Sequence, residues 1–217
     1  MNQKIKNLLE KLENNNMKAY YVENKEEALE LAKTLIPIGA TIAAGGSSTN
    51  KEIGLMDYVM NGEFNFLDRN NPKLTPEESM QVCVESMNAD VYLSSSNAIT
   101  ENGELYNIDG NCNRIAALSF GPKSVIICAG INKIVPDINA ATLRLKTIAA
   151  PKNSARFGFK NYCVVKEHCI SIDQGKGECI GAGCDSPTRI CRTTMVHAKQ
   201  KIKDRIKVIL IGEELGY

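Results

Sequence analysis

Two runs of apolar residues, SVIICA at 124–129 and IKVILI at 206–211, constrain the fold of this chain most strongly. An uninterrupted apolar run of this length is typical of a strand buried on both faces, as in a parallel sheet. Further strands are predicted at 18–22, 40–44, 89–93 and 104–108, and helices at 1–16, 25–35, 51–60, 75–88, 138–150 and 192–203. Because strands and helices alternate, we expect an α/β fold with a mainly parallel sheet.

The length of 217 residues predicts one compact domain. We expect residues 1–150 to form an α/β ligand-binding core that begins with an N-terminal helix. Residues 151–191 contain many Gly, Cys, Lys and Asp residues and little periodicity, so they are predicted to be a cysteine-rich loop region. Residues 192–217 are predicted to supply a basic helix and a closing strand that complete the same domain.

The charge balance excludes several kinds of partner. Lys and Arg number 26 against 25 Asp and Glu, which leaves a formal net charge of +1, and aromatic residues make up only 6% with no Trp. Such a chain has neither the positive field nor the stacking platforms that bind nucleic acid. The first residues lack the apolar stretch of a signal peptide and no apolar run reaches 18 residues, so we expect a cytoplasmic protein without a membrane span.

A glycine- and hydroxyl-rich loop follows the strand predicted at 40–44. Gly45 and Gly46 allow the backbone to approach a ligand closely, and the predicted helix after them presents free N–H groups to an anion. Ser47, Ser48 and Thr49 add hydroxyl donors. The loop matches neither a Walker motif nor a dinucleotide-binding fingerprint, so ATP and NAD are disfavoured. The alternative is a tight turn whose Ser or Thr caps the helix.

A second group of polar residues lies between positions 89 and 135, close to the ends of predicted strands. Ligands of open α/β sheets bind at the carboxyl ends of the strands, so we expect these side chains to gather around one. Lys133 follows strand 124–129 and is therefore a better candidate than Lys123, which precedes it. The alternative is that Asn, Asp and Gly simply form turns. The group comprises Asn97, Glu101, Asn107, Asp109, Asn113, Arg114, Lys123, Asn132 and Lys133.

Cysteine is unusually frequent, because five of the eight cysteines lie between Cys163 and Cys191. A reducing compartment disfavours disulfides, so an iron–sulfur cluster or a zinc ion is a possible explanation. The candidate ligands are Cys169, Cys179, Cys184 and Cys191, with Cys163 and His168 as other choices for the fourth. Unpaired thiols in a loop are an equally good interpretation. Cys83 and Cys128 are expected in the core, and His197 on the surface.

Several longer motifs resemble the lactate-utilisation (LUD) domain family, in its small variant with a cysteine-containing C-terminal tail. They are GGSST, SNAITENGELYNIDGNCNRIAAL, FGPKSVIICAGINKIV, AAPKNSARFG and CDSPTRICRTTMV, and they extend from about Ala40 to Val196 in the family order. The resemblance implies a Rossmann-like fold similar to that of ribose-phosphate isomerases and coenzyme A transferases. This chain differs from the family pattern in the tail, where Cys179 and Cys184 are separated by four residues rather than two.

The resemblance also implies a function. Family members occur with iron–sulfur oxidoreductase subunits that oxidise L-lactate to pyruvate, which suggests an accessory subunit that binds a small anion. The alternative is a stand-alone enzyme, of isomerase or transferase type, that acts on a sugar phosphate or an acyl anion. If the site is catalytic, Glu101 is the candidate base and Lys133 the candidate oxyanion stabiliser. Whether the protein is an enzyme or forms a homo-oligomer stays open at this point.

Overall fold

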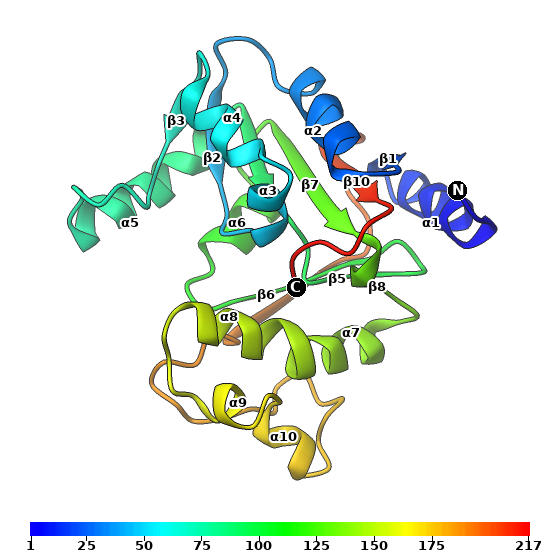
Figure 1. Ribbon diagram of the computed structural model, residues 1–217, viewed down its shortest axis with the longest axis vertical. Coiled ribbons are helices and arrows are strands. Elements are labelled where there is room, and N and C mark those ends of the chain that lie inside the picture. The colour runs from blue at the N-terminus through cyan, green and yellow to red at the C-terminus, as the bar shows by residue number, and fades with distance from the viewer.

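The computed structural model describes residues 1–217, which form two β-sheets with helices packed around them (Figure 1). The larger sheet has six parallel strands in the order β1-β10-β7-β4-β2-β3. Its strands are β1 (Lys18–Val22), β2 (Thr41–Ala44), β3 (Asn65–Leu67), β4 (Val91–Ser94), β7 (Ser124–Gly130) and β10 (Ile206–Ile211). The apolar strands β7 and β10 are neighbours near the centre, so the predicted α/β fold with a mainly parallel sheet is confirmed.

The smaller sheet has four strands in the order β8-β5-β6-β9. They are β5 (Ala98–Thr100), β6 (Leu105–Asp109), β8 (Ile134–Val135) and β9 (Thr193–His197). β5 and β6 form an antiparallel hairpin, and β9 pairs antiparallel with β6. This sheet packs on the helices that follow β8, and the C-terminus lies between those helices and the larger sheet (Figure 1).

Short helices connect the strands. Asn24 and Thr75 cap their helices, and Thr75 forms a complete capping box with Glu78. The helices are α1 (Gln3–Asn14), α2 (Lys25–Thr34), α3 (Ser48–Glu52), α4 (Leu55–Asn61), α5 (Pro76–Glu85), α6 (Asn113–Ser119), α7 (Ile138–Arg144), α8 (Ala150–Arg156), α9 (Tyr162–Val165) and α10 (Ile170–Asp173).

The two faces of the larger sheet bury alternate residues of each strand. Val208 and Leu210 of β10 belong to a core on the side of α1 and α6, whereas Ile209 and Ile211 belong to a core on the side of α2 and α4. Each fully buried aliphatic side chain contributes about 1.5–3 kcal/mol to the stability of the folded state. Because both faces of the central strands are buried, every residue along these strands gains from being apolar, which explains their continuous apolar sequence.

Three predicted elements differ from the structure. The helix predicted at 192–203 is wrong: β-branched Thr193, Thr194 and Val196 belong to strand β9, which pairs with β6. The helix predicted at 51–60 is divided into α3 and α4 at Gly54, whose φ is +76°. The helix predicted to end at Ala150 continues through a π-helical turn at Leu145–Ala149 into α8, which tolerates Pro151 in its first turn.

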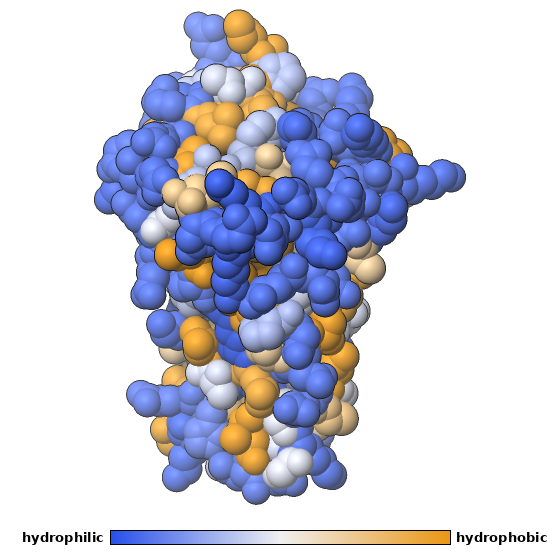
Figure 2. Space-filling model, turned by 90° about the vertical axis from the view of Figure 1, so that its right-hand side faces the viewer, coloured by the Kyte–Doolittle hydropathy of each residue, from blue (hydrophilic) through white to orange (hydrophobic).

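None of the helices combines the length and the apolar character needed to cross a bilayer. On the face shown in Figure 2, apolar residues form separate small patches among polar ones.

Candidate functional site

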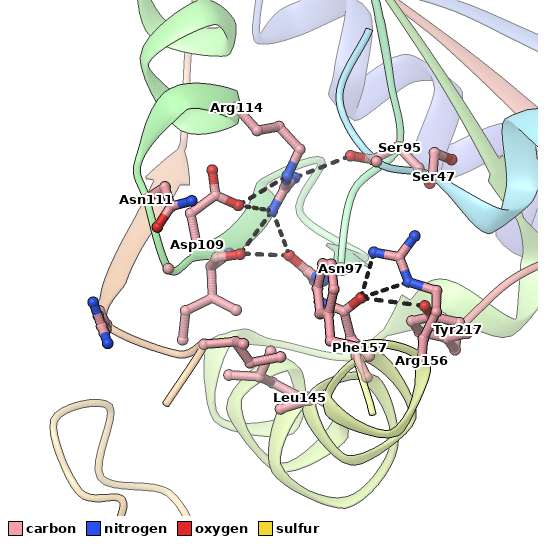
Figure 3. A pocket seen from close by; sticks show the side chains of 18 of the residues that line it. Ser47, Ser95, Asn97, Asp109, Asn111, Arg114, Leu145, Arg156, Phe157 and Tyr217 are labelled. Carbon is pink, nitrogen blue, oxygen red and sulfur yellow. Dashed lines mark hydrogen bonds and ion pairs between the residues drawn. The ribbon is translucent and has the colours of Figure 1, made fainter. Parts of the chain in front are cut away.

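A cavity of about 360 Å³ opens where the larger sheet meets the smaller sheet and α8 (Figure 3). β2, β4 and β7 are neighbours in the parallel sheet, so the loops at their carboxyl ends lie side by side. The loop after β2 brings Ser47, the loop after β4 brings Ser95, and the turn after β7 brings Lys133. Ligands of open α/β sheets bind at this kind of edge, and the volume suits a small molecule.

The loop after β2 contributes to the cavity lining, but the helix that follows it is short. Gly46, Ser47 and Ser48 line the cavity, and the Ser47 hydroxyl accepts a hydrogen bond from the Asn50 amide at 3.1 Å. Ser47 therefore also caps α3, which was the alternative interpretation of this loop. α3 has only five residues, so a helix dipole does not account for the charge of the cavity.

Arg114 organises the floor of the cavity. Its guanidinium pairs with Asp109 at 2.8 Å and donates to the side-chain oxygens of Asn97 at 3.0 Å and Asn107 at 2.5 Å. It also donates to the Ser95 carbonyl at 3.3 Å and the Ile108 carbonyl at 2.8 Å (Figure 3). Because its donors are engaged by the protein, Arg114 positions the surrounding loops rather than leaving free donors for a ligand.

Lys133 is a buried ammonium group without a carboxylate partner. It is 2% exposed, and Nζ donates to the Thr49 hydroxyl at 2.8 Å and to the Ser95 hydroxyl at 2.9 Å. Burial lowers the pKa of Lys133 to about 7, and the nearby positive charges of Arg144 and Arg114 lower it further in the same direction. An anion bound in the cavity would raise the pKa of Lys133 again, because a nearby negative charge favours the protonated form.

Two more cations, which the sequence analysis did not single out, converge on Gly46. A Cβ on Gly46 would lie 3.4 Å from Nη2 of Arg156 and 3.6 Å from Nη2 of Arg69. The Arg69 side chain forms no ion pair and its buried Nε has no partner, while Arg156 donates to the side-chain oxygen of Asn153. Arg192 is a further cavity cation, whereas Asp109 is the carboxylate that lines the cavity.

The structure brings some of the predicted residues to the cavity and places others just behind it. Gly46, Ser47, Ser48, Asn97, Asp109, Asn113, Arg114 and Lys133 line it. Behind the lining, Thr49 holds Lys133, and Gly45 lies under the Arg114 side chain. Asn107 is fully buried beneath Arg114, and Asn132 holds the C-terminal segment through Leu215 and Gly216.

Two predicted site residues lie elsewhere. Glu101 is in the turn between β5 and β6, where it pairs with Lys4 of α1 at 2.7 Å. Because the hairpin reverses the chain direction, its turn lies away from the cavity. Lys123 lies at the amino end of β7 and pairs with Asp90 at 2.7 Å. Neither residue lines the cavity, so Glu101 is not placed to act as a base there and Lys123 is not placed to bind a ligand there.

Arg144 fixes the loops that carry Asn97 and Lys133. Its guanidinium donates to the Asn97 carbonyl at 2.7 Å and to the Asn132 carbonyl at 3.1 Å. Burial lowers the pKa of Arg144. The sequence analysis missed this residue because its role depends on backbone carbonyls that are distant in sequence.

The cysteine-rich region forms the far wall of the cavity. Phe157, Phe159, Thr188 and Arg189 come from this region and line the cavity, and Arg192, which follows the region directly, lines it as well. The motifs AAPKNSARFG and CDSPTRICRTTMV contain Arg156, Arg189 and Arg192. The arginines of these motifs were the sequence signal that could have identified this side of the cavity.

The candidate metal ligands do not all face the same way. Cys163, Cys169, Cys184 and Cys191 line a second, smaller cavity, whereas Cys179 is exposed and does not line it. No three His, Cys, Asp or Glu side chains are close enough together to enclose a metal ion. His197 is buried rather than exposed, and burial lowers its pKa to about 4. The prediction of a surface position for His197 is therefore wrong.

Comparison with known proteins agrees with this description. A family profile described as the LUD domain matches residues 5–211. No curated protein matches the chain. A solved structure of a DUF162 family protein from Deinococcus radiodurans is similar in fold, with a TM-score of 0.52, 14% identity and coverage of 96% of each chain. The family profile spans nearly the whole sequence, and the chain therefore belongs to the LUD domain family.

Proposed function

We propose that the protein binds a small anion, with a phosphate or carboxylate group, in the cavity between the two sheets. The observation that carries this proposal is the approach of Arg69 and Arg156 to Gly46 without a carboxylate partner. Like charges repel, and a buried cation such as Lys133 costs free energy unless an anion compensates it. An anionic ligand beside Gly46 would satisfy the free donors of Arg69 and Arg156 and favour protonated Lys133.

Calorimetric titration with inorganic phosphate, L-lactate, pyruvate and ribose 5-phosphate tests this proposal. We expect at least one of these probes to bind, and Arg69→Gln to weaken its binding about 10-fold or more, since a charge-assisted hydrogen bond contributes about 1.5–3 kcal/mol. Lys123→Gln is the matched control, because it removes the same charge far from the cavity. Absence of binding by all four probes, or equal losses in both variants, would contradict the proposal.

We further propose that this binding serves an accessory subunit of an iron–sulfur-dependent system that oxidises L-lactate to pyruvate. Membership of the LUD domain family and the many cationic side chains that line the cavity support this role. The test is to measure L-lactate-dependent reduction of an electron acceptor by the iron–sulfur subunits, with and without this protein. Stimulation by the wild-type protein but not by Arg69→Gln would support the role; no stimulation would contradict it.

One observation favours an alternative function as an enzyme acting on a sugar phosphate or an acyl anion. A lysine whose pKa is about 7 can both accept and donate a proton near neutral pH, and Lys133 lines the cavity. Incubation with ribose 5-phosphate in D2O, followed by NMR, would reveal isomerisation or deuterium incorporation. The enzyme hypothesis requires that Lys133→Met abolish the reaction while Lys123→Gln leaves it unchanged.

A further inference from the structure

Four cysteines from separate parts of the cysteine-rich region face one small cavity of about 20 Å³. Cys163 belongs to α9, Cys169 precedes α10, and Cys184 and Cys191 lie in the segment 174–192, which contains no helix or strand. Besides the cysteines, the lining is largely apolar, with Ile108, Leu145, Ala150, Tyr162, Ile170, Ile180 and Ala182. A segment of this length without regular structure usually needs an additional constraint to hold it.

The size and lining of this cavity determine what it can hold. A space of about 20 Å³ accommodates roughly one water-sized particle, and a buried water needs two to four polar partners. The cysteine side chains are weak hydrogen-bond partners but strong ligands for soft metal ions once deprotonated. The volume also suits a single ion rather than an iron–sulfur cluster, which contains several atoms.

Two cations beside the cavity match the charge of such a site. Four thiolates and one divalent ion carry a net charge of −2, and Lys146 and Arg189 both line the cavity. Lys146 donates to the Cys179 carbonyl at 2.5 Å, and Arg189 donates to the carbonyls of Cys184 at 3.1 Å and Cys191 at 2.8 Å. The bonds of Arg189 hold the backbone of two proposed ligands, Cys184 and Cys191, next to compensating positive charge.

We propose that Cys163, Cys169, Cys184 and Cys191 together bind one soft divalent metal ion such as Zn²⁺, with Cys179 outside the ligand set. On binding, each thiol releases its proton to solvent and forms a bond to the ion. No three of these side chains are close enough together to enclose an ion in the described arrangement, so the half-buried Cys184 and Cys191 must move inward. The segment that carries them contains no helix or strand, so this movement breaks no regular helical or sheet hydrogen bonds.

The site would also stabilise the wall of the anion cavity. Leu145, Ala150 and Arg189 line both cavities, so they form the partition between them. A metal ion that fixes Cys184 and Cys191 would fix Arg189 through its bonds to their carbonyls, and with it the neighbouring Thr188 and Arg192.

Zinc titration of the chelator-treated full-length protein tests the proposal. We expect one Zn²⁺ per chain by atomic emission, and a thiolate-to-metal charge-transfer absorption when Co²⁺ replaces Zn²⁺. In the wild-type protein, zinc should slow alkylation of Cys184 and Cys191 by N-ethylmaleimide at least 10-fold, measured by mass spectrometry, and leave exposed Cys179 unchanged. This measurement needs no variant and so does not depend on the folding of one.

Single Cys→Ser variants then define the ligand set. Cys163→Ser, Cys169→Ser, Cys184→Ser and Cys191→Ser should each weaken zinc binding at least 10-fold, and Cys179→Ser should bind as the wild type does. The proposal is overturned if no zinc binds, if zinc protects Cys179 as strongly as Cys184, or if Cys179→Ser loses zinc while Cys163→Ser retains it. Copurification of several irons with inorganic sulfide would likewise overturn the single-ion site.

Discussion

The side chain of Arg114 packs directly over Gly45: a Cβ on this glycine would lie 2.9 Å from Cδ of Arg114. The same arginine bonds to Asp109 and Asn107 of β6 and to Asn97 in the loop between β4 and β5, so its position sets how these two segments are arranged. The absence of a side chain at position 45 is therefore a condition for the geometry of the cavity.

Gly45→Ala should displace Arg114 and weaken anion binding. The added methyl group forces either the arginine or the loop after β2 to shift by several tenths of an ångström. We expect about a 10-fold loss of affinity for the phosphate or carboxylate probe in calorimetry, and a lower Tm. Gly181→Ala is the control and should bind normally, because a methyl group added there would have no neighbouring atom within 4 Å. Equal affinities of the two variants would contradict this role of Gly45.

Lys133 should make the stability of the protein depend on pH above neutrality. Its pKa is about 7 in the folded protein against 10.5 ordinarily, so the unfolded chain binds more protons between these values and stability rises with pH. From pH 6.5 to 8.5 the free energy of unfolding should increase by about 2 kcal/mol. Urea unfolding of Lys133→Met should lack this increase, and a parallel increase in both proteins would assign it to other groups.

Anion affinity should change in the opposite direction. Below pH 7 Lys133 is protonated and attracts the anion, and as the pH rises through 7 the free protein loses this charge. We therefore expect the affinity for L-lactate or ribose 5-phosphate to fall between pH 6.5 and 8.5 in calorimetry. Lys133→Met should bind more weakly at pH 6.5 and show a smaller pH dependence; an unchanged dependence in this variant would exclude Lys133 as its cause.

His197 should make the fold sensitive to acid. Burial, together with the charge of Arg205, lowers the pKa of His197 to about 4, so the unfolded chain gains a proton first as the pH falls below 6.5. Between pH 7 and pH 5 this should cost about 1–2 kcal/mol of stability. His197→Leu should unfold with a smaller acid dependence in urea titrations. His168→Leu, which removes a partly exposed histidine, is the control.

Asp109 and Glu101 should differ sharply in their effect on the cavity. Asp109 pairs with Arg114 and accepts the Ile115 amide at 2.9 Å, so Asp109→Asn should loosen the cavity floor and weaken anion binding about 10-fold. Glu101 pairs with Lys4 outside the cavity, so Glu101→Gln should bind as the wild type does. Binding of the same probe by both variants is the measurement, and a loss confined to Glu101→Gln would contradict the described site.

Local patterns in the sequence predicted most of the regular structure because those patterns reflect burial. The apolar run of β7 corresponds to a strand covered on both faces, as expected. The same reasoning failed for residues 192–203, where basic residues suggested a helix. There, pairing with β6 supplies hydrogen bonds that only a distant strand can offer.

The amino-acid sequence by itself determined the alternation of strands and helices, the family, and the loop of Gly46, Ser47 and Ser48 as part of a polar site. The alternation of elements and the loop follow from hydrophobic periodicity and local backbone preferences, which act over a few residues, whereas the family follows from longer motifs that match its profile. The tertiary structure decided that Arg69 and Arg156 both approach Gly46 and that Glu101 lies outside the larger cavity. It also decided that Cys163, rather than Cys179, lines the small cavity with the other three cysteines. Such contacts depend on strand order and hairpin direction, which bring together residues far apart in the chain.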